Sequence, residues 1–168
     1  MEDSDKDLKI HAEKKAEALV QKLKTHSLTV ALAESCTAGM VSSLLANVAG
    51  ASSVLWGSFV CYTQEAKVSM LGVDNDELSA YGLVSRETAS SMASCALQKS
   101  GADIAAAVTG LAGPDGDGSG VPVGTVWIAS AVREGKVTAR EFHFEGSRNN
   151  VRINAVLTIL EIIESLAC

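Results

Sequence analysis

The middle of the chain contains a run of small apolar residues, Asp103-Ile104-Ala105-Ala106-Ala107-Val108-Thr109. A strand that is apolar at nearly every position is typical of one buried on both faces of a sheet, with helices covering each face. Residues 110–120 follow directly and contain five glycines. We therefore predict a central strand that leads into a long glycine-rich loop.

Helical and strand patterns alternate on both sides of this run. Apolar residues at helical spacing predict helices over residues 6–24, 37–48, 64–71, 85–100 and 148–166. Runs rich in apolar and β-branched residues predict strands over 27–33, 54–62, 103–109, 123–131 and 137–144. Early alternation favours parallel strands, and Glu134-Gly135 favours a late antiparallel hairpin. The predicted fold class is α/β, a three-layer α/β/α sandwich with one mixed, mostly parallel sheet of about five strands.

Length and composition favour one ordered domain over residues 1–168, with residues 1–9 as a disordered tail. Hydrophobic residues make up 47% of the 168 residues and charged residues 20%, which excludes a disordered chain. Aromatic residues make up only 4%, whereas 24 residues are alanine. The core must therefore consist of small and aliphatic side chains, which let helices and strands approach closely.

The charge balance bears on the kind of partner. The net charge is -6, from 14 Lys and Arg against 20 Asp and Glu. Binding a nucleic acid polymer needs clustered basic side chains, so we exclude that class of partner. A small anionic ligand needs only one or two basic residues and a few main-chain N–H groups, and it stays compatible with this composition.

The sequence pattern favours a cytoplasmic protein without a membrane segment. The first five residues are acidic where a signal peptide is basic, and no apolar run approaches the roughly 18 residues that span a bilayer. The cysteines at 36, 61, 95 and 168 match no zinc spacing and are expected to be reduced thiols. The apolar last helix favours a homo-oligomer.

Three breaks follow predicted strands, where open α/β sheets place their ligand crevice. In the first, residues 34–39, the hydroxyl of Ser35 either serves as a nucleophile or caps the next helix. The second, residues 62–67, contains Lys67, which is either a surface lysine or a general base with a lowered pKa. No histidine neighbours these breaks, so elimination favours a lysine as the base of an activated serine.

The third break, residues 109–118, could bind an anion through its main-chain N–H groups or be an ordinary surface loop. Its Asp115-Gly116-Asp117-Gly118 segment lacks the remaining ligands of a calcium loop, so we expect no metal. Arg148 opens the last helix, where the helix dipole disfavours a cation. It therefore faces either an anion such as a phosphate or an acidic neighbour such as Glu145.

Four segments in order carry a resemblance to a known family: residues 33–39 (AESCTAG), 62–67 (YTQEAK), 109–116 (TGLAGPDG) and 122–127 (PVGTVW). Together they resemble the CinA C-terminal domain family, the nicotinamide-nucleotide amidases. The similarity runs from about residue 10 to the C-terminus. It implies hydrolysis of nicotinamide mononucleotide to nicotinate mononucleotide and ammonia in pyridine nucleotide salvage, without a metal or cofactor.

The resemblance also implies roles for individual residues. Ser35 would be the nucleophile, Lys67 its base, and Tyr62 an orienting or proton-relaying phenol. The residues implied in substrate binding are Thr37, Gly39, Ser52, Thr109, Gly110 and Arg148, with Ser52 and Arg148 near the phosphate.

Two departures from the family pattern concern the turn after Ser35. Ala38 stands where the family has glycine. Alanine would strain the turn if this position has a positive φ, and it would be harmless in the first turn of a helix. We expect the helical conformation. Cys36 adjoins Ser35 and is an alternative nucleophile. Two further classes stay open on sequence alone, a non-catalytic module that senses a nucleotide and an interaction domain that oligomerises through its last helix.

Overall fold

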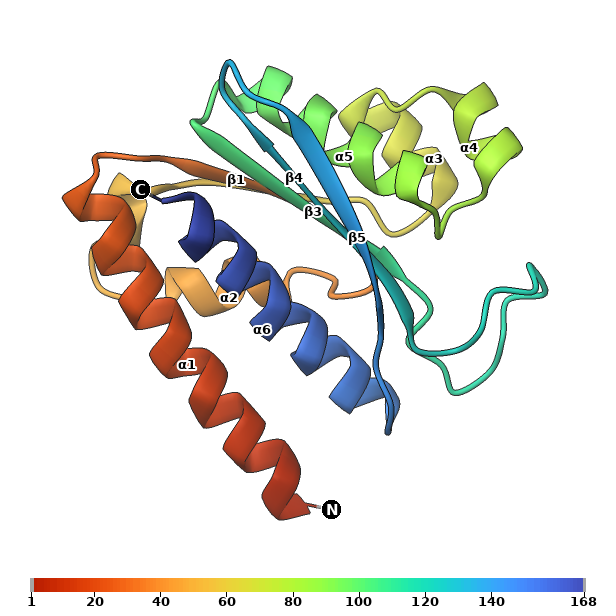
Figure 1. The fold of residues 1–168 in the computed structure, drawn as a ribbon, viewed down its shortest axis with the longest axis horizontal. Helices are drawn as coiled ribbons and strands as arrows, with labels where there is room; N and C mark the ends of the chain where they lie inside the picture. Colours follow the sequence, from red (N-terminus) through yellow and green to blue (C-terminus); the bar gives the residue numbers. More distant parts are fainter. Residues whose placement is uncertain (1, 168) are drawn as a thin grey trace.

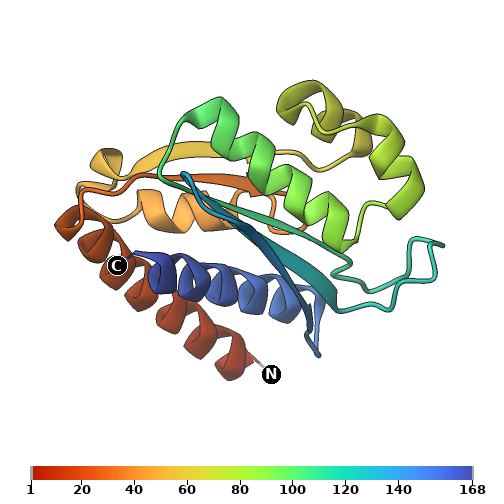
Figure 2. The ribbon, with the colours of Figure 1, turned by 45° about the horizontal axis from the view of Figure 1, so that its top comes forward.

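A mixed sheet runs through the middle of the protein and helices cover both of its faces (Figure 1, Figure 2). The computed structural model describes residues 2–167, with side chains from residue 6 onward. Within these residues the five strands lie in the order β2-β1-β3-β4-β5. They are β1 (Val30–Glu34), β2 (Leu55–Val60), β3 (Ile104–Gly110), β4 (Thr125–Val132) and β5 (Val137–His143).

The strand pairings confirm the predicted α/β fold class. Strand β1 pairs in parallel with both β2 and β3, whereas β3–β4 and β4–β5 are antiparallel. Among the described strands, four point in one direction and β4 runs against them. The predicted late hairpin is the β4–β5 pair.

The helices form two layers, one on each face of the sheet (Figure 2). One layer consists of α1 (Glu2–Thr25), α2 (Met40–Ala46) and α6 (Arg148–Leu166). The other contains α5 (Arg86–Ser100), with the short α3 (Gln64–Ala66) and α4 (Asn75–Tyr81) beside it. A 3₁₀ turn, η1 (Ala51–Ser53), precedes β2, and a π-helical turn, η2 (Lys67–Leu71), follows α3.

Side-chain alternation gives the two faces of the sheet different characters. The face toward α1, α2 and α6 carries larger aliphatic residues, among them Val30, Leu32, Ile104, Val108 and Ile128. The face toward α5 carries alanines: Ala33, Ala105, Ala107, Ala129 and Ala131. Helix α5 also presents small residues, Ala89, Ala93 and Ala96, so it packs closely on the sheet. Alanines therefore form most of the contact between α5 and the sheet, in agreement with the predicted core of small and aliphatic side chains.

The helices differ from the sequence prediction in two start positions and one additional helix, and β1, β2 and β4 are displaced or shortened by one to three residues at their ends. Helix α1 begins at Glu2, so residues 2–9 are helical where a disordered tail was expected, and Leu8 packs with the core of Ala12, Ile153 and Leu157. Met1 lies outside the described residues. Helix α2 begins at Met40 rather than at residue 37. Helix α4 was not predicted, although Asp74 caps its N-terminus by accepting a hydrogen bond from the Asp76 N–H.

Helix α6 lies between α1 and the sheet (Figure 1). Its apolar residues, including Val151, Ala155, Ile159 and Ile163, are buried in the core of the same chain. The apolar character of α6 is therefore satisfied within the chain, and the homo-oligomer stays a prediction. Within residues 2–167, no helix has the length and apolarity required to cross a membrane.

Candidate active site

The chain segments that leave β1, β2 and β3 meet at one edge of the sheet. These strands are parallel, so their carboxyl ends lie together. Ser35 follows β1, Tyr62 follows β2, and Thr109 and Gly110 end β3. This edge is where an open α/β sheet places its ligand crevice.

A buried serine and a buried lysine are in contact at this edge. Lys67 Nζ lies 3.0 Å from Ser35 Oγ, within hydrogen-bond distance, and also donates to the Cys61 carbonyl at 3.0 Å. Lys67 is 1% exposed and Ser35 is 7% exposed. Lys67 reaches the serine because Thr63 caps the turn after β2 and brings residue 67 back toward β1. The predicted pairing of the two residues is therefore present in the geometry.

The environment of Lys67 favours its neutral form. Burial lowers the pKa of the Lys67 ammonium below its ordinary value of 10.5, and the nearby Cys61 and Cys36 thiols oppose this lowering. No ion pair of Lys67 with a carboxylate occurs among the described residues. An uncharged amine in contact with a hydroxyl can accept its proton, which a surface ammonium cannot do at neutral pH.

A pocket of about 170 Å³ opens onto this pair and is lined by residues from several loops. Its lining includes Ser35, Tyr62, Lys67, Thr109, Gly110, Asp117 and Arg148. Arg148 donates to the Tyr62 hydroxyl at 2.8 Å and to the Gly113 carbonyl at 2.7 Å, so it joins the end of β2 to the glycine-rich loop. The expected alternative, an ion pair of Arg148 with Glu145, does not occur among the described residues.

Three other predicted residues have hydrogen-bond partners within the protein, and a fourth lies apart from the pocket. Thr109 is buried in the pocket wall, and its hydroxyl donates to the Leu83 carbonyl at 2.7 Å. The Thr37 hydroxyl and the Gly39 N–H both donate to Glu34 Oε2. Ser52 lies in η1 before β2, at the opposite edge of the sheet from Ser35. The structure therefore brings together Ser35, Lys67, Tyr62, Thr109, Gly110 and Arg148, but it does not bring Ser52 to them.

Glu34 organises the turn that carries Ser35, a role that was not predicted from the sequence. It is fully buried at the end of β1. Its carboxylate accepts hydrogen bonds from the side chains of Thr37 and Ser58 and from the N–H groups of Gly39, Val41 and Ser42. These N–H groups include the free donors at the start of α2. An acidic residue that ends an otherwise apolar strand is the sequence signal that marks it.

Arg152 holds the same turn from the other side. Its guanidinium donates to the Cys36 carbonyl at 3.0 Å and to the Thr37 carbonyl at 2.9 Å. It lies one helical turn after Arg148, and these two are the basic residues of α6, which is the signal that could have drawn attention to it.

Ala38 adopts a left-handed conformation, with φ of 50°. The expectation that Ala38 occupies an ordinary helical first turn is therefore wrong. Helix α2 begins two residues later, after Gly39, which is also left-handed at φ 89°. The position does require the positive φ that glycine adopts without strain, and alanine there is disfavoured by about 1–2 kcal/mol.

Cys36 is buried beside Ser35 and packs in the core. Burial raises the pKa of its thiol to about 11, although Lys67 and Arg152 act in the opposite direction. A thiol at this pKa is almost entirely protonated at neutral pH, and the thiolate is the reactive form. Cys61 and Cys95 are also free thiols, and Cys168 lies outside the described residues.

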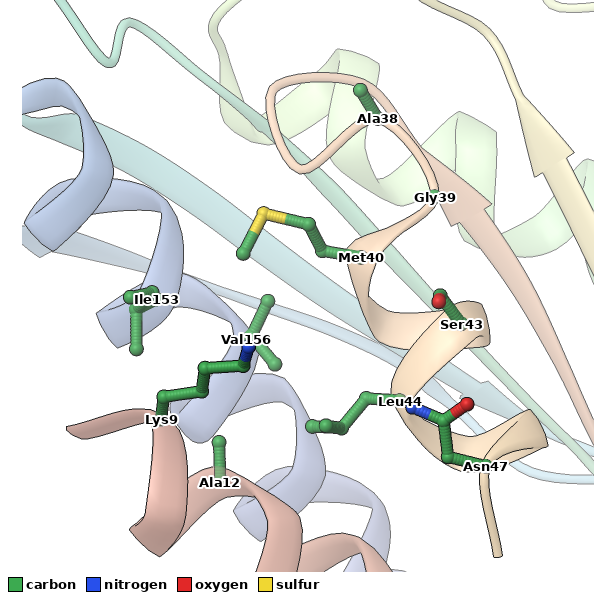
Figure 3. Close-up of a pocket in the computed structure, with 10 residues that line it drawn as sticks. All are labelled: Lys9, Ala12, Ala38, Gly39, Met40, Ser43, Leu44, Asn47, Ile153 and Val156. Carbon is green, nitrogen blue, oxygen red and sulfur yellow. The ribbon is translucent and has the colours of Figure 1, made fainter. Parts of the chain in front are cut away.

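A larger pocket, of about 320 Å³, lies between α1, α2 and α6 (Figure 3). Ala38 and Gly39 form part of its wall, opposite Ile153 and Val156 of α6. It contains neither Ser35 nor Lys67 and is mostly apolar, so size alone does not identify the reactive site. Among the described residues, no cluster of three or more His, Cys, Asp or Glu side chains could hold a metal ion.

The family model of the CinA C-terminal domain matches residues 12–167. The chain belongs to this family. A CinA-like protein of Thermotoga neapolitana is 43% identical over 149 residues, which make up 89% of this chain and 36% of that protein. A CinA-like protein of Kosmotoga olearia is 41% identical over 147 residues, 88% of this chain and 35% of that protein. The chain thus spans little more than a third of the length of these curated relatives.

Two solved structures of the family share the fold along nearly their whole length. The competence/damage inducible protein CihA from Agrobacterium tumefaciens is 40% identical, with a TM-score of 0.88 over 92% of this chain and 94% of that chain. A CinA superfamily protein from Escherichia coli is 34% identical, with a TM-score of 0.86 over 93% of this chain and 89% of that chain.

Replacing Glu34 with glutamine should destabilise the protein. The new NH₂ group must face hydrogen-bond donors, because both carboxylate oxygens accept bonds from them. We expect the free energy of unfolding to fall by about 1–3 kcal/mol in urea denaturation. Glu13→Gln, at an exposed position on α1, is the control and should change it by less than about 0.5 kcal/mol. Equal stabilities of the two variants would contradict the role of Glu34.

Replacing Ala38 with glycine should stabilise the protein, because glycine adopts φ of 50° without strain. We expect a gain of up to about 1 kcal/mol in the free energy of unfolding, since the added chain entropy of glycine offsets part of the strain. Ala80→Gly in helix α4 is the matched control and should lose about 1 kcal/mol. A loss in both variants would show that Ala38 is not strained.

Proposed function

We propose that this chain is a single amidase domain that hydrolyses the carboxamide of nicotinamide mononucleotide in the cytoplasm, giving nicotinate mononucleotide and ammonia. The observation that carries the proposal is the 3.0 Å contact between the buried Lys67 Nζ and Ser35 Oγ. Membership of the CinA C-terminal domain family supports the same assignment. A lysine with a lowered pKa beside a serine is the arrangement that a serine nucleophile requires where no histidine is at hand.

The proposed reaction has two stages, with Lys67 moving the proton in each. Neutral Lys67 takes the hydroxyl proton as Ser35 Oγ bonds to the amide carbon, and the ammonium then protonates the departing nitrogen as the C–N bond breaks. Ammonia then departs, and the acyl group remains bound to Ser35 Oγ as an ester. Lys67, neutral again, takes a proton from water as the water oxygen bonds to the ester carbon. It then gives that proton to Ser35 Oγ as the ester bond breaks, which releases the acid product, ionised at neutral pH, and restores Ser35.

The main-chain N–H groups after Ser35 are the proposed donors to the oxyanion. The Ser35 N–H is occupied, since it donates to the Val108 carbonyl at 3.0 Å. No main-chain carbonyl of the described residues accepts a hydrogen bond from the N–H of Cys36 or of Thr37, and both N–H groups lie beside the Cys36 thiol, which they stabilise in its ionised form. Such donors are typically worth about 3–4 kcal/mol each in the transition state.

The size of the pocket and the presence of Arg148 support a nucleotide whose pyridine ring enters the pocket first. A volume of about 170 Å³ lies below the roughly 300–1,000 Å³ of sites that enclose a drug-sized ligand, so the ribose and phosphate would extend toward the loop. Arg148 is the proposed phosphate contact, with Tyr62 orienting it. Thr109 and Gly110 would line the ring. We propose Ser35 rather than Cys36 as nucleophile because the Cys36 thiol has a pKa of about 11.

Replacing Ser35 with alanine should lower ammonia release from nicotinamide mononucleotide by at least about 10⁴-fold, because the nucleophile is lost. An enzyme-coupled ammonia assay measures the rate, and thermal unfolding checks the fold. Ser79→Ala, on the exposed face of α4, is the matched control and should keep full activity. Full activity of Ser35→Ala would refute the assignment of Ser35 as the nucleophile. Tight binding of the nucleotide by the unaltered protein without turnover would instead favour a sensing module.

Replacing Lys67 with methionine should abolish activity and change how stability depends on pH. Because the folded protein lowers the Lys67 pKa below 10.5, the unfolded chain binds more protons between the two values, and the free energy of unfolding rises with pH across that window. The stability of Lys67→Met relative to the unaltered protein should therefore be highest at low pH and decline as pH approaches 10.5.

Urea denaturation between neutral pH and pH 10 measures this difference, with Lys14→Met on the exposed face of α1 as control. In the unaltered protein, kcat/KM should fall as pH falls through the lowered pKa, because the base becomes protonated. A difference in stability that stays constant with pH would contradict a lowered Lys67 pKa.

A further inference from the structure

The turn after Ser35 is bound from two sides by groups of opposite charge. The Glu34 carboxylate accepts hydrogen bonds from N–H groups and a hydroxyl of this turn and of α2. The Arg152 guanidinium donates to its carbonyls. The two side chains form no ion pair with each other among the described residues. Glu34 therefore binds main-chain N–H groups and two hydroxyls, whereas Arg152 binds main-chain carbonyls.

Arg152 fixes the peptide group that the turn itself leaves free. The Ala38 N–H donates to the Ser35 carbonyl at 3.0 Å, which closes a four-residue turn. That bond fixes the ends of the turn but not its central peptide, between Cys36 and Thr37. The Cys36 carbonyl belongs to this central peptide, and it accepts from Arg152 Nε.

The orientation of this peptide matters because a trans peptide directs its N–H away from its carbonyl. With the Cys36 carbonyl held by Arg152, the Thr37 N–H points away from α6. Rotation of the peptide would turn a carbonyl oxygen to where the N–H points, and a carbonyl repels an oxyanion. Helix α6 and the turn border the same pocket, with Ile153 and Val156 on one wall and Ala38 and Gly39 on another (Figure 3).

We propose that Arg152 is a positioning residue for the reaction. It holds the Cys36–Thr37 and Thr37–Ala38 peptides so that Ser35 and the N–H groups that follow it keep the arrangement needed in the transition state. This proposal rests on the proposed function for its catalytic part. Its structural part, that Arg152 immobilises the turn, is independent of the substrate.

The first test compares Arg152→Ala and Arg152→Lys with the unaltered protein in the ammonia assay. Loss of a positioned oxyanion donor typically lowers kcat by about 10²–10³-fold. We expect a fall of this size for Arg152→Ala and a smaller one for Arg152→Lys, with KM within about 2-fold. Millimolar guanidinium should restore kcat of Arg152→Ala at least about 10-fold and leave the unaltered protein unchanged. Arg140→Ala, at an exposed position on β5, is the matched control and should keep full activity.

Unchanged kcat in Arg152→Ala, or a rise in KM alone, would overturn the proposal, since the latter indicates direct contact with substrate. If Arg152→Ala does not fold, Arg152→Lys tests the proposal instead. A lowered kcat at an unchanged melting temperature would support the positioning role of Arg152, and an unchanged kcat would overturn it.

The second test measures how accessible the turn is and needs no substrate. Alkylation of the buried Cys36, followed by mass spectrometry, should be at least about 10-fold faster in Arg152→Ala, because the carbonyl of Cys36 is released. Cys61, also buried but bound through its carbonyl to Lys67, is the internal control and should not change. Equal Cys36 rates would overturn the proposal. If the unaltered protein releases no ammonia, the proposed function fails, whereas the alkylation rates still decide the role of Arg152.

Discussion

The buried carboxylate of Glu34 is the interaction on which the candidate site depends. A carboxylate removed from water must have its oxygens satisfied, and here five donors from the following turn, α2 and β2 do so. This requirement ends β1, begins α2, and forces the intervening residues into a tight turn with two left-handed positions, Ala38 and Gly39. Ser35 is presented to the pocket because it lies inside that turn.

The fold was predictable where a residue's environment depends on its near neighbours in sequence. The apolar run 103–109 lies in the centre of the sheet, and the alanine-rich composition forms the closely packed face under α5. The start of α1 was not predictable in this way, because Leu8 is ordered by contacts with α6. Helix α4 has a capping residue but only seven residues, too few to show a helical period.

The candidate site follows the same division. Ser35, Lys67 and Arg148 stand in breaks after strands or at a helix start, which are positions that a sequence displays. Arg152 does not, because its partners are the Cys36 and Thr37 carbonyls, more than 110 residues earlier in the chain, and main-chain atoms leave no trace in a sequence. The sequence raised strain at Ala38 as an alternative but could not decide it, since the left-handed conformation is held by hydrogen bonds to Glu34 on either side of it.

The alternation of side chains along β1 explains why the buried Lys67 forms no ion pair with the acidic residue next to Ser35. Consecutive residues of a strand point to opposite faces, so Glu34 faces α2 while Ser35 faces η2 and Lys67. An ion pair with Glu34 would raise the pKa of Lys67, which burial lowers. Because its carboxylate binds donors on the other face, Glu34 supports the turn without forming an ion pair with Lys67. The direct adjacency of Glu34 and Ser35 in the sequence therefore keeps the carboxylate and the lysine on opposite faces.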